Sequence, residues 1–143
     1  NGTCAVVQVD YSLLNRAPEA AFLPYCQEHG IGVMVRGPLA KGVLSGRYNG
    51  ESTFTDTVRA GWNDDGAARS KFLEQVGQVE KLSQIVAPGP EMVATAICYT
   101  ASHPAVSVTI PGAKSAAQAT TNAAAGDRLY TDAEMRKLAA AVG

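Results

Sequence analysis

The sequence has few charged residues, few aromatic side chains and few cysteines. Only 17% of its 143 residues are charged and 46% are apolar, which argues against a long disordered chain of one charge sign. Twelve Lys and Arg residues stand against thirteen Asp and Glu, so the formal net charge is -1. Proteins that bind nucleic acid through its phosphates usually carry a basic excess, and we therefore expect no nucleic-acid partner.

Long hydrophobic runs and a recognisable secretory signal are also missing. The longest nearly apolar stretch, residues 92–101, is far shorter than the roughly 20 residues that span a bilayer, so no membrane association is expected. No charged segment followed by an apolar one opens the sequence, which predicts no signal peptide. The cysteines (Cys4, Cys26 and Cys98) are widely spaced and odd in number, which argues against a disulfide framework and a Cys-rich zinc site. These features predict one cytoplasmic globular domain over residues 1–143 without a metal site.

Hydrophobic patterning predicts strands that alternate with helices. The nearly continuous apolar run 5–11 is typical of a strand buried on both faces, and residues 31–36 and 106–110 are two further strand candidates. Helices are predicted over residues 18–29, 72–86, 90–102, 115–125 and 131–142. Such alternation implies parallel strands joined by right-handed crossovers. The glycine-bearing segment 37–68 shows little periodicity, and a loop of this length is usually functional or disordered.

Two of the predicted strand ends are candidate anion sites, because ligands collect at the carboxyl ends of parallel strands. The second strand leads into residues 37–47, where glycines permit a close backbone approach and Lys41 and Arg47 add positive charge. A generic surface loop is the alternative at this point. The third strand leads past Lys114 into a helix start, and free N–H groups there favour phosphate. Ser115 and Gln118 have capping-box spacing, which is compatible with anion binding.

Catalytic side chains do not form a recognisable constellation. Gln8 is a polar residue inside an apolar strand, and by itself it is best explained as a buried amide with a structural hydrogen-bond partner. His29 and His103 are expected at a helix end and in a turn, with no catalytic partner beside them. Tyr11 is a strand-end phenol without a neighbouring Lys or His. By spacing alone, the chain offers anion-binding features and no acid–base site.

Four ordered blocks of the sequence resemble the aldo-keto reductases. They are residues 8–16 (QVDYSLLNR), 25–32 (YCQEHGIG), 36–48 (RGPLAKGVLSGRY) and 110–122 (IPGAKSAAQATTN). The resemblance implies an α/β fold of the TIM (β/α)8 type and reduction of aldehydes and ketones by hydride transfer from NADPH. A full barrel takes about 250 residues. The chain is therefore expected to be a partial barrel, the last three strand–helix units, with three parallel strands and flanking helices.

The same resemblance implies that this chain contains no catalytic residue. The family's Asp, Tyr, Lys and His tetrad comes from earlier barrel strands, so Tyr11, His29 and Lys41 are not its counterparts. The segment is expected to be inactive alone. The alternative is a non-catalytic nucleotide-binding or structural module. Unpaired sheet edges invite pairing with another chain, so it would associate with a second copy or with the missing N-terminal part.

The resemblance implies that this chain contains the cofactor-binding half of the family's active site. Gln8 matches the glutamine that binds the nicotinamide carboxamide, and Arg36 stands where many members have an aromatic ring, which suggests guanidinium stacking. Gln118 replaces an arginine common at the 2′-phosphate, so NAD is possible beside NADP. The expected cofactor residues are Gln8, Arg36, Gly37, Pro38, Leu39, Ala40, Lys41, Gly42, Arg47, Arg59, Gly112, Ala113, Lys114, Gln118, Thr121 and Asn122.

Overall fold

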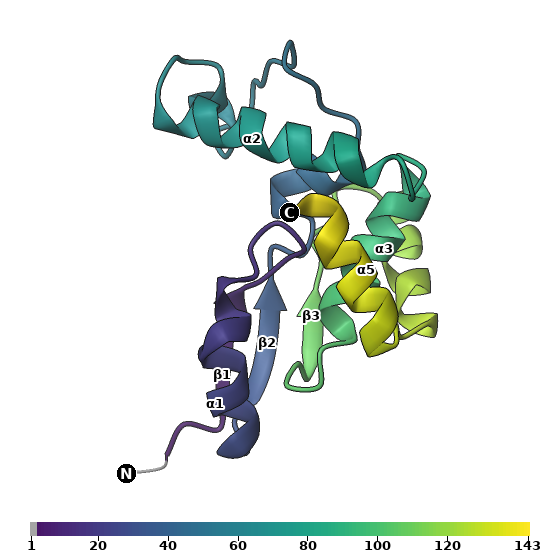
Figure 1. Cartoon of the computed structure of the whole chain (residues 1–143). Helices are drawn as coiled ribbons and strands as arrows, with labels where there is room; N and C mark the ends of the chain where they lie inside the picture. Colours follow the sequence, from purple (N-terminus) through teal and green to yellow (C-terminus); the bar gives the residue numbers. More distant parts are fainter. Residues whose placement is uncertain (1–2) are drawn as a thin grey trace.

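The computed structural model describes residues 3–143 and confirms an α/β fold (Figure 1). The strands are β1 (Val6–Asp10), β2 (Gly32–Arg36) and β3 (Val108–Ile110). The α-helices are α1 (Phe22–Glu28), α2 (Ala67–Leu82), α3 (Pro90–Ala101), α4 (Ala116–Ala124) and α5 (Asp132–Val142). Short 3-10 turns are η1 (Ala17–Ala20), η2 (Ala40–Ser45), η3 (Ala60–Trp62) and η4 (Ala125–Asp127). None of the helices in residues 3–143 has the length and apolar character needed to cross a membrane.

The three strands form one parallel sheet in the order β1-β2-β3. Val7 pairs with Val33 across the first ladder, and Met34 pairs with Val108 across the second. Parallel pairing needs crossover connections, and the chain supplies α1 in the first crossover and α2 and α3 in the second. The carboxyl ends of β2 and β3 therefore lie at the same edge of the sheet, and the arrowheads in Figure 1 point the same way.

The prediction that residues 5–11 form a strand buried on both faces is wrong. Val33 and Val35 of β2 are fully buried, whereas Val6 is 58% exposed and Val108 is 44% exposed. Side chains alternate along a strand, so Val6, Val108 and Ile110 lie on the opposite face from the buried valines. One face of this parallel sheet is thus packed by helices, and no part of residues 3–143 buries the other.

The segment between β2 and α2, which the sequence leaves without periodicity, is ordered by a chain of aromatic rings. Tyr48, Phe54, Trp62 and Phe72 contact one another with ring centroids 4.7–5.4 Å apart. Asn63 joins two parts of the segment, because its side chain accepts from the Phe54 N–H at 2.8 Å and donates to the Phe54 carbonyl at 2.7 Å. We call the rings of Tyr48, Phe54, Trp62 and Phe72 the aromatic cluster. It anchors the segment to α2.

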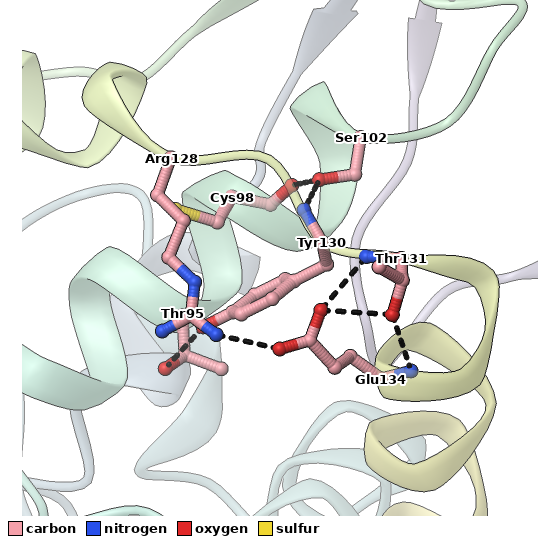
Figure 2. A network of polar contacts seen from close by, with 7 residues as sticks. All are labelled: Thr95, Cys98, Ser102, Arg128, Tyr130, Thr131 and Glu134. Carbon is pink, nitrogen blue, oxygen red and sulfur yellow. Dashed lines mark hydrogen bonds and ion pairs between the residues drawn. The ribbon is translucent and has the colours of Figure 1, made fainter.

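The start of α5 is fixed by the capping box that its sequence predicts, shown in Figure 2. The Glu134 N–H donates to Thr131 Oγ1 at 3.3 Å, and the Thr131 N–H donates to Glu134 Oε2 at 2.8 Å. The bond from the Thr131 backbone holds the pKa of Glu134 below its usual range. One residue earlier, the Tyr130 N–H donates to Ser102 Oγ at 2.7 Å, so the start of α5 is tied to the end of α3.

Candidate functional site

A cavity of about 690 Å³ lies where the segments that follow β2 and β3 meet. This volume is within the usual range for small-molecule sites. The predicted cofactor residues that line the cavity are Gly37, Pro38, Leu39, Lys41, Gly42, Arg47, Arg59, Gly112, Ala113, Lys114, Gln118, Thr121 and Asn122. The lining residues that sequence reasoning missed are Ser45, Tyr48, Asp56, Val58, Pro90, Val93 and Ala117.

Positive charge is concentrated on this cavity. Its lining includes Lys41, Arg47, Arg59 and Lys114, and among the described residues Asp56 is the one acid in the lining. Lys41, Arg47 and Arg59 come from the segment between β2 and α2, and the fold brings Lys114 to them from the segment between β3 and α4. The cavity thus has a positive charge that the chain as a whole, at -1, does not have. A cleft lined by one sign of charge raises the local concentration of oppositely charged ligands. The cavity therefore fits a phosphorylated ligand.

The backbone is strained at the wall of the cavity that follows β2. Ala40 and Lys41 have φ values of 46° and 56°, and Gly42 follows at 95°. Non-glycine residues in this region cost of order 1–3 kcal/mol each, and such strain clusters at ligand sites. The tight turn is closed by bonds from the Ala40 N–H to the Gly37 carbonyl (2.9 Å) and from the Gly42 N–H to the Leu39 carbonyl (2.8 Å). Ala40 does not line the cavity itself, but it belongs to the turn that places Lys41 there.

Arg59 is held in one orientation by its neighbours. Its Nε donates to Asp56 Oδ2 at 2.8 Å, and its Nη1 donates to the Tyr48 hydroxyl. The guanidinium carbon lies 5.4 Å from the centre of the Tyr48 ring and 5.2 Å from that of Phe54. Asp56 is fixed in turn, since its Oδ1 accepts from the N–H groups of Val58 and Arg59, both at 3.2 Å. A guanidinium has five N–H donors, more than these contacts use, so Arg59 keeps donors for a ligand.

The start of α4 forms the opposite wall. Ser115 Oγ accepts from the Gln118 N–H at 3.2 Å, which confirms the predicted N-cap. In a capping box the Gln118 side chain would accept from the Ser115 N–H. Its Oε1 instead accepts from the N–H of the preceding residue, Lys114, at 2.7 Å. Asn122 is buried, and its amide donates to the Gly112 carbonyl at 3.2 Å. Gln118 and Asn122 thus fix the backbone that follows β3 while they line the cavity.

Gln8 and Arg36 lie outside the cavity lining. Gln8 is exposed on the open face of β1, so its interpretation as a buried amide is wrong. Arg36 forms an ion pair with Asp10, with Nη1 and Oδ2 at 2.9 Å, and its side chain is 59% exposed. Asp10 also accepts from the Asn15 amide at 3.2 Å. Asp10 and Arg36 thus lie together at the ends of β1 and β2, next to Gly37. The role of Gln8 and Arg36 in cofactor binding stays a prediction.

Tyr11 is fully buried, and the half-buried His103 packs edge-on against its ring. The hydroxyls of Tyr11 and Tyr99 donate to the same Glu19 oxygen, at 2.7 and 2.8 Å. Burial raises the pKa of Tyr11 and raises the pKa of Tyr99 to about 12. Burial also lowers the pKa of His103, whose Nδ1 accepts from the Ala105 N–H at 3.2 Å. Neither tyrosine lines the cavity. No cluster of His, Cys, Asp and Glu within residues 3–143 is suited to hold a metal ion.

Comparison with known proteins gives consistent matches over nearly the whole chain. The sequence profile of the Aldo/keto reductase family matches residues 3–142. The uncharacterized oxidoreductase YqkF of Bacillus subtilis is 32% identical over 133 residues, which are 92% of this chain and 41% of the relative. A probable voltage-gated potassium channel subunit beta of Arabidopsis thaliana is 35% identical over 127 residues, which are 85% of this chain and 38% of the relative.

A solved structure leads to the same assignment. The aldo-keto reductase AKR11C1 from Bacillus halodurans superposes with a TM-score of 0.68 at 26% identity, over 97% of this chain and 42% of that chain. The chain thus spans about two fifths of the length of these relatives. Its three parallel strands correspond to part of the family's TIM barrel. The chain belongs to the aldo/keto reductase family.

Proposed function

We propose that this chain holds NADP, with NAD as the alternative, and is the cofactor-binding part of an oxidoreductase that reduces aldehydes and ketones. The observation that carries the proposal is the convergence of Lys41, Arg47, Arg59 and Lys114 on one cavity at the carboxyl ends of β2 and β3. Family membership supports a nicotinamide cofactor as the ligand. When bound, that cofactor supplies the hydride for the carbonyl carbon.

The chain's own residues bind and orient in this proposal. Lys41 and the strained turn that carries it bind the pyrophosphate. The guanidinium of Arg59, which Asp56 already orients, donates to phosphate oxygens. Lys114 and the first N–H groups of α4 hold the phosphate of the adenosine half. Gln8 and Arg36 orient the nicotinamide half at the open face. In the proposal the acid that protonates the carbonyl oxygen lies outside this chain, as the family resemblance implies. Tyr11 and Tyr99 fit this placement, because both donate to Glu19 away from the cavity.

Titration of the chain with NADPH and NADH tests this proposal. Trp62 is the only tryptophan, and Lys41 Nζ lies 5.7 Å from the centre of its ring, so a ligand at Lys41 is expected to change its fluorescence. Calorimetry provides an independent affinity. We expect saturable binding and no turnover of an aromatic aldehyde. Failure to bind either cofactor would refute the proposal, and turnover by this chain alone would refute the placement of the acid elsewhere.

Self-association is a second candidate function, favoured by the open face of the sheet. Val6, Val108 and Ile110 expose apolar surface there, although parallel sheets are normally covered on both faces. β1 and β3 also have no further strand beside them within residues 3–143. A second copy of the chain offers the same apolar face and the same free edges, so two copies can cover one another.

Light scattering over a range of concentrations tests this candidate. We expect the molar mass to rise toward that of a dimer, and we expect Val108→Lys to weaken the association by placing a charge on the open face. Leu129→Lys is the matched control, because Leu129 is 66% exposed and lies outside the sheet. A wild-type chain that stays monomeric at high concentration, or equal effects of the two substitutions, would exclude association through this face.

A further inference from the structure

We infer that Asp56 sets the balance between NADP and NAD by lowering the affinity of the cavity for a 2′-phosphate. The inference rests on the proposed function, since it concerns the same cavity and the same ligands. Asp56 is the one acid in the lining among residues 3–143, where the other charged side chains of the lining are cations. Sequence reasoning did not single it out.

The Asp56 carboxylate is fixed in position and stays ionised. Arg59 Nε and Nη2 contact its Oδ2 at 2.8 and 2.7 Å, and two backbone N–H groups hold its Oδ1. The side chain is nevertheless 29% exposed, and Asp56 lines the cavity, so its charge is accessible to a ligand there. The Arg59 guanidinium holds the pKa of Asp56 below its usual range, and Lys114 contributes in the same direction. Asp56 and Lys114 both line this cavity, so a ligand that fills it meets both charges.

The two cofactors differ only at the ribose 2′ position, and this is where the charge of Asp56 matters. A 2′-phosphate held at Lys114 brings negative charge toward the carboxylate, which opposes binding. A neutral 2′-hydroxyl can instead donate a hydrogen bond to an acid, as in many NAD sites. The side-chain oxygen of Gln118 already accepts a hydrogen bond from the Lys114 N–H, which holds this side chain in the wall of the cavity. The pyrophosphate is common to both cofactors, so its interaction with Asp56 cancels in the ratio of their affinities.

The test compares the ratio of dissociation constants, Kd for NADP over Kd for NAD, in the wild type and in Asp56→Asn. Asparagine keeps an oxygen for the Val58 and Arg59 N–H groups and removes the charge. We expect the ratio to fall about tenfold by calorimetry. Asp65→Asn is the matched control, because it removes the same charge from the same segment at an exposed position outside the cavity lining. Its ratio is expected to equal that of the wild type.

An unchanged ratio in Asp56→Asn, or an equal change in Asp65→Asn, would overturn the inference while leaving the proposed function intact. A wild-type chain that binds neither cofactor would refute the proposed function and this inference together. Circular dichroism checks that the variants fold. If Asp56→Asn does not fold, Asp56→Ser replaces it, because a serine hydroxyl can also accept from the following N–H groups. The same fall in ratio is required of that variant.

Discussion

Replacing Gly46 with alanine is expected to lower the free energy of unfolding by about 2–5 kcal/mol. Gly46 ends η2 with a φ of 68°, a backbone conformation that costs an L-residue about 1–2 kcal/mol. A Cβ there would also lie 2.9 Å from Pro88 Cβ and 3.1 Å from the sulfur of Met92, which is fully buried. Urea denaturation followed by circular dichroism and by Trp62 fluorescence measures the loss.

Gly30→Ala is the matched control for this substitution. Gly30 has a similar φ of 63°, but a Cβ there would meet no atom within 4 Å. Its cost is therefore limited to the backbone term of about 1–2 kcal/mol. The difference between the two variants isolates the contact of the segment after β2 with the start of α3. Equal losses would show that this packing is looser than the distances indicate.

Replacing Arg59 with methionine is expected to weaken NADPH binding about 100-fold. The substitution removes a guanidinium that is already oriented by Asp56 and Tyr48, and it leaves the Asp56 carboxylate without its ion pair beside the cofactor phosphates. Both consequences oppose binding, so the effect should exceed that of a single lost phosphate contact. Calorimetric titration with NADPH measures it.

Lys71→Met is the control for the loss of one positive charge, because Lys71 is exposed on α2 and does not line the cavity. We expect its affinity to match that of the wild type. A second check combines Arg59→Met with Asp56→Asn, which should recover part of the affinity by removing the unpaired carboxylate. If Arg59→Met binds NADPH as tightly as Lys71→Met does, the guanidinium makes no contact with the cofactor.

The helices and strands were largely predictable because periodicity and capping residues act locally. Thr131 and Glu134 form the expected capping box, and Ser115 caps α4 as its spacing predicts. The burial of β1 was not predictable in this way. An apolar run such as residues 5–11 indicates that its side chains are suited to burial. It does not indicate whether the described chain contains the helices or strands that would cover them. Val6 is therefore an apolar residue, typical of a buried strand, that lies exposed on the open face.

The candidate site was predictable only in part. The turn at Gly37 and the start of α4 follow strand ends, so general rules for α/β sheets already point to them, and the family resemblance names their residues. Asp56, Tyr48 and Val58 were missed because the path of their segment depends on ring contacts that have no regular spacing. One local signal existed, since Asp56 stands three residues before Arg59. At this spacing the carboxylate can accept hydrogen bonds from both the backbone N–H and the guanidinium of the arginine.

The aromatic cluster has a thermodynamic consequence for ligand binding. Lys41 lies over Trp62, and Arg59 lies over Tyr48 and Phe54, so two of the four cations that line the cavity lie against rings that belong to the hydrophobic core or pack on it. Arg59 is also bonded to Asp56 and Tyr48, so part of its conformational entropy is lost when the chain folds and need not be lost again on association. The cavity exists only in the folded chain, so a bound ligand at free concentration L should add RT ln(1 + L/Kd) to the free energy of unfolding, and the melting temperature should rise with ligand concentration.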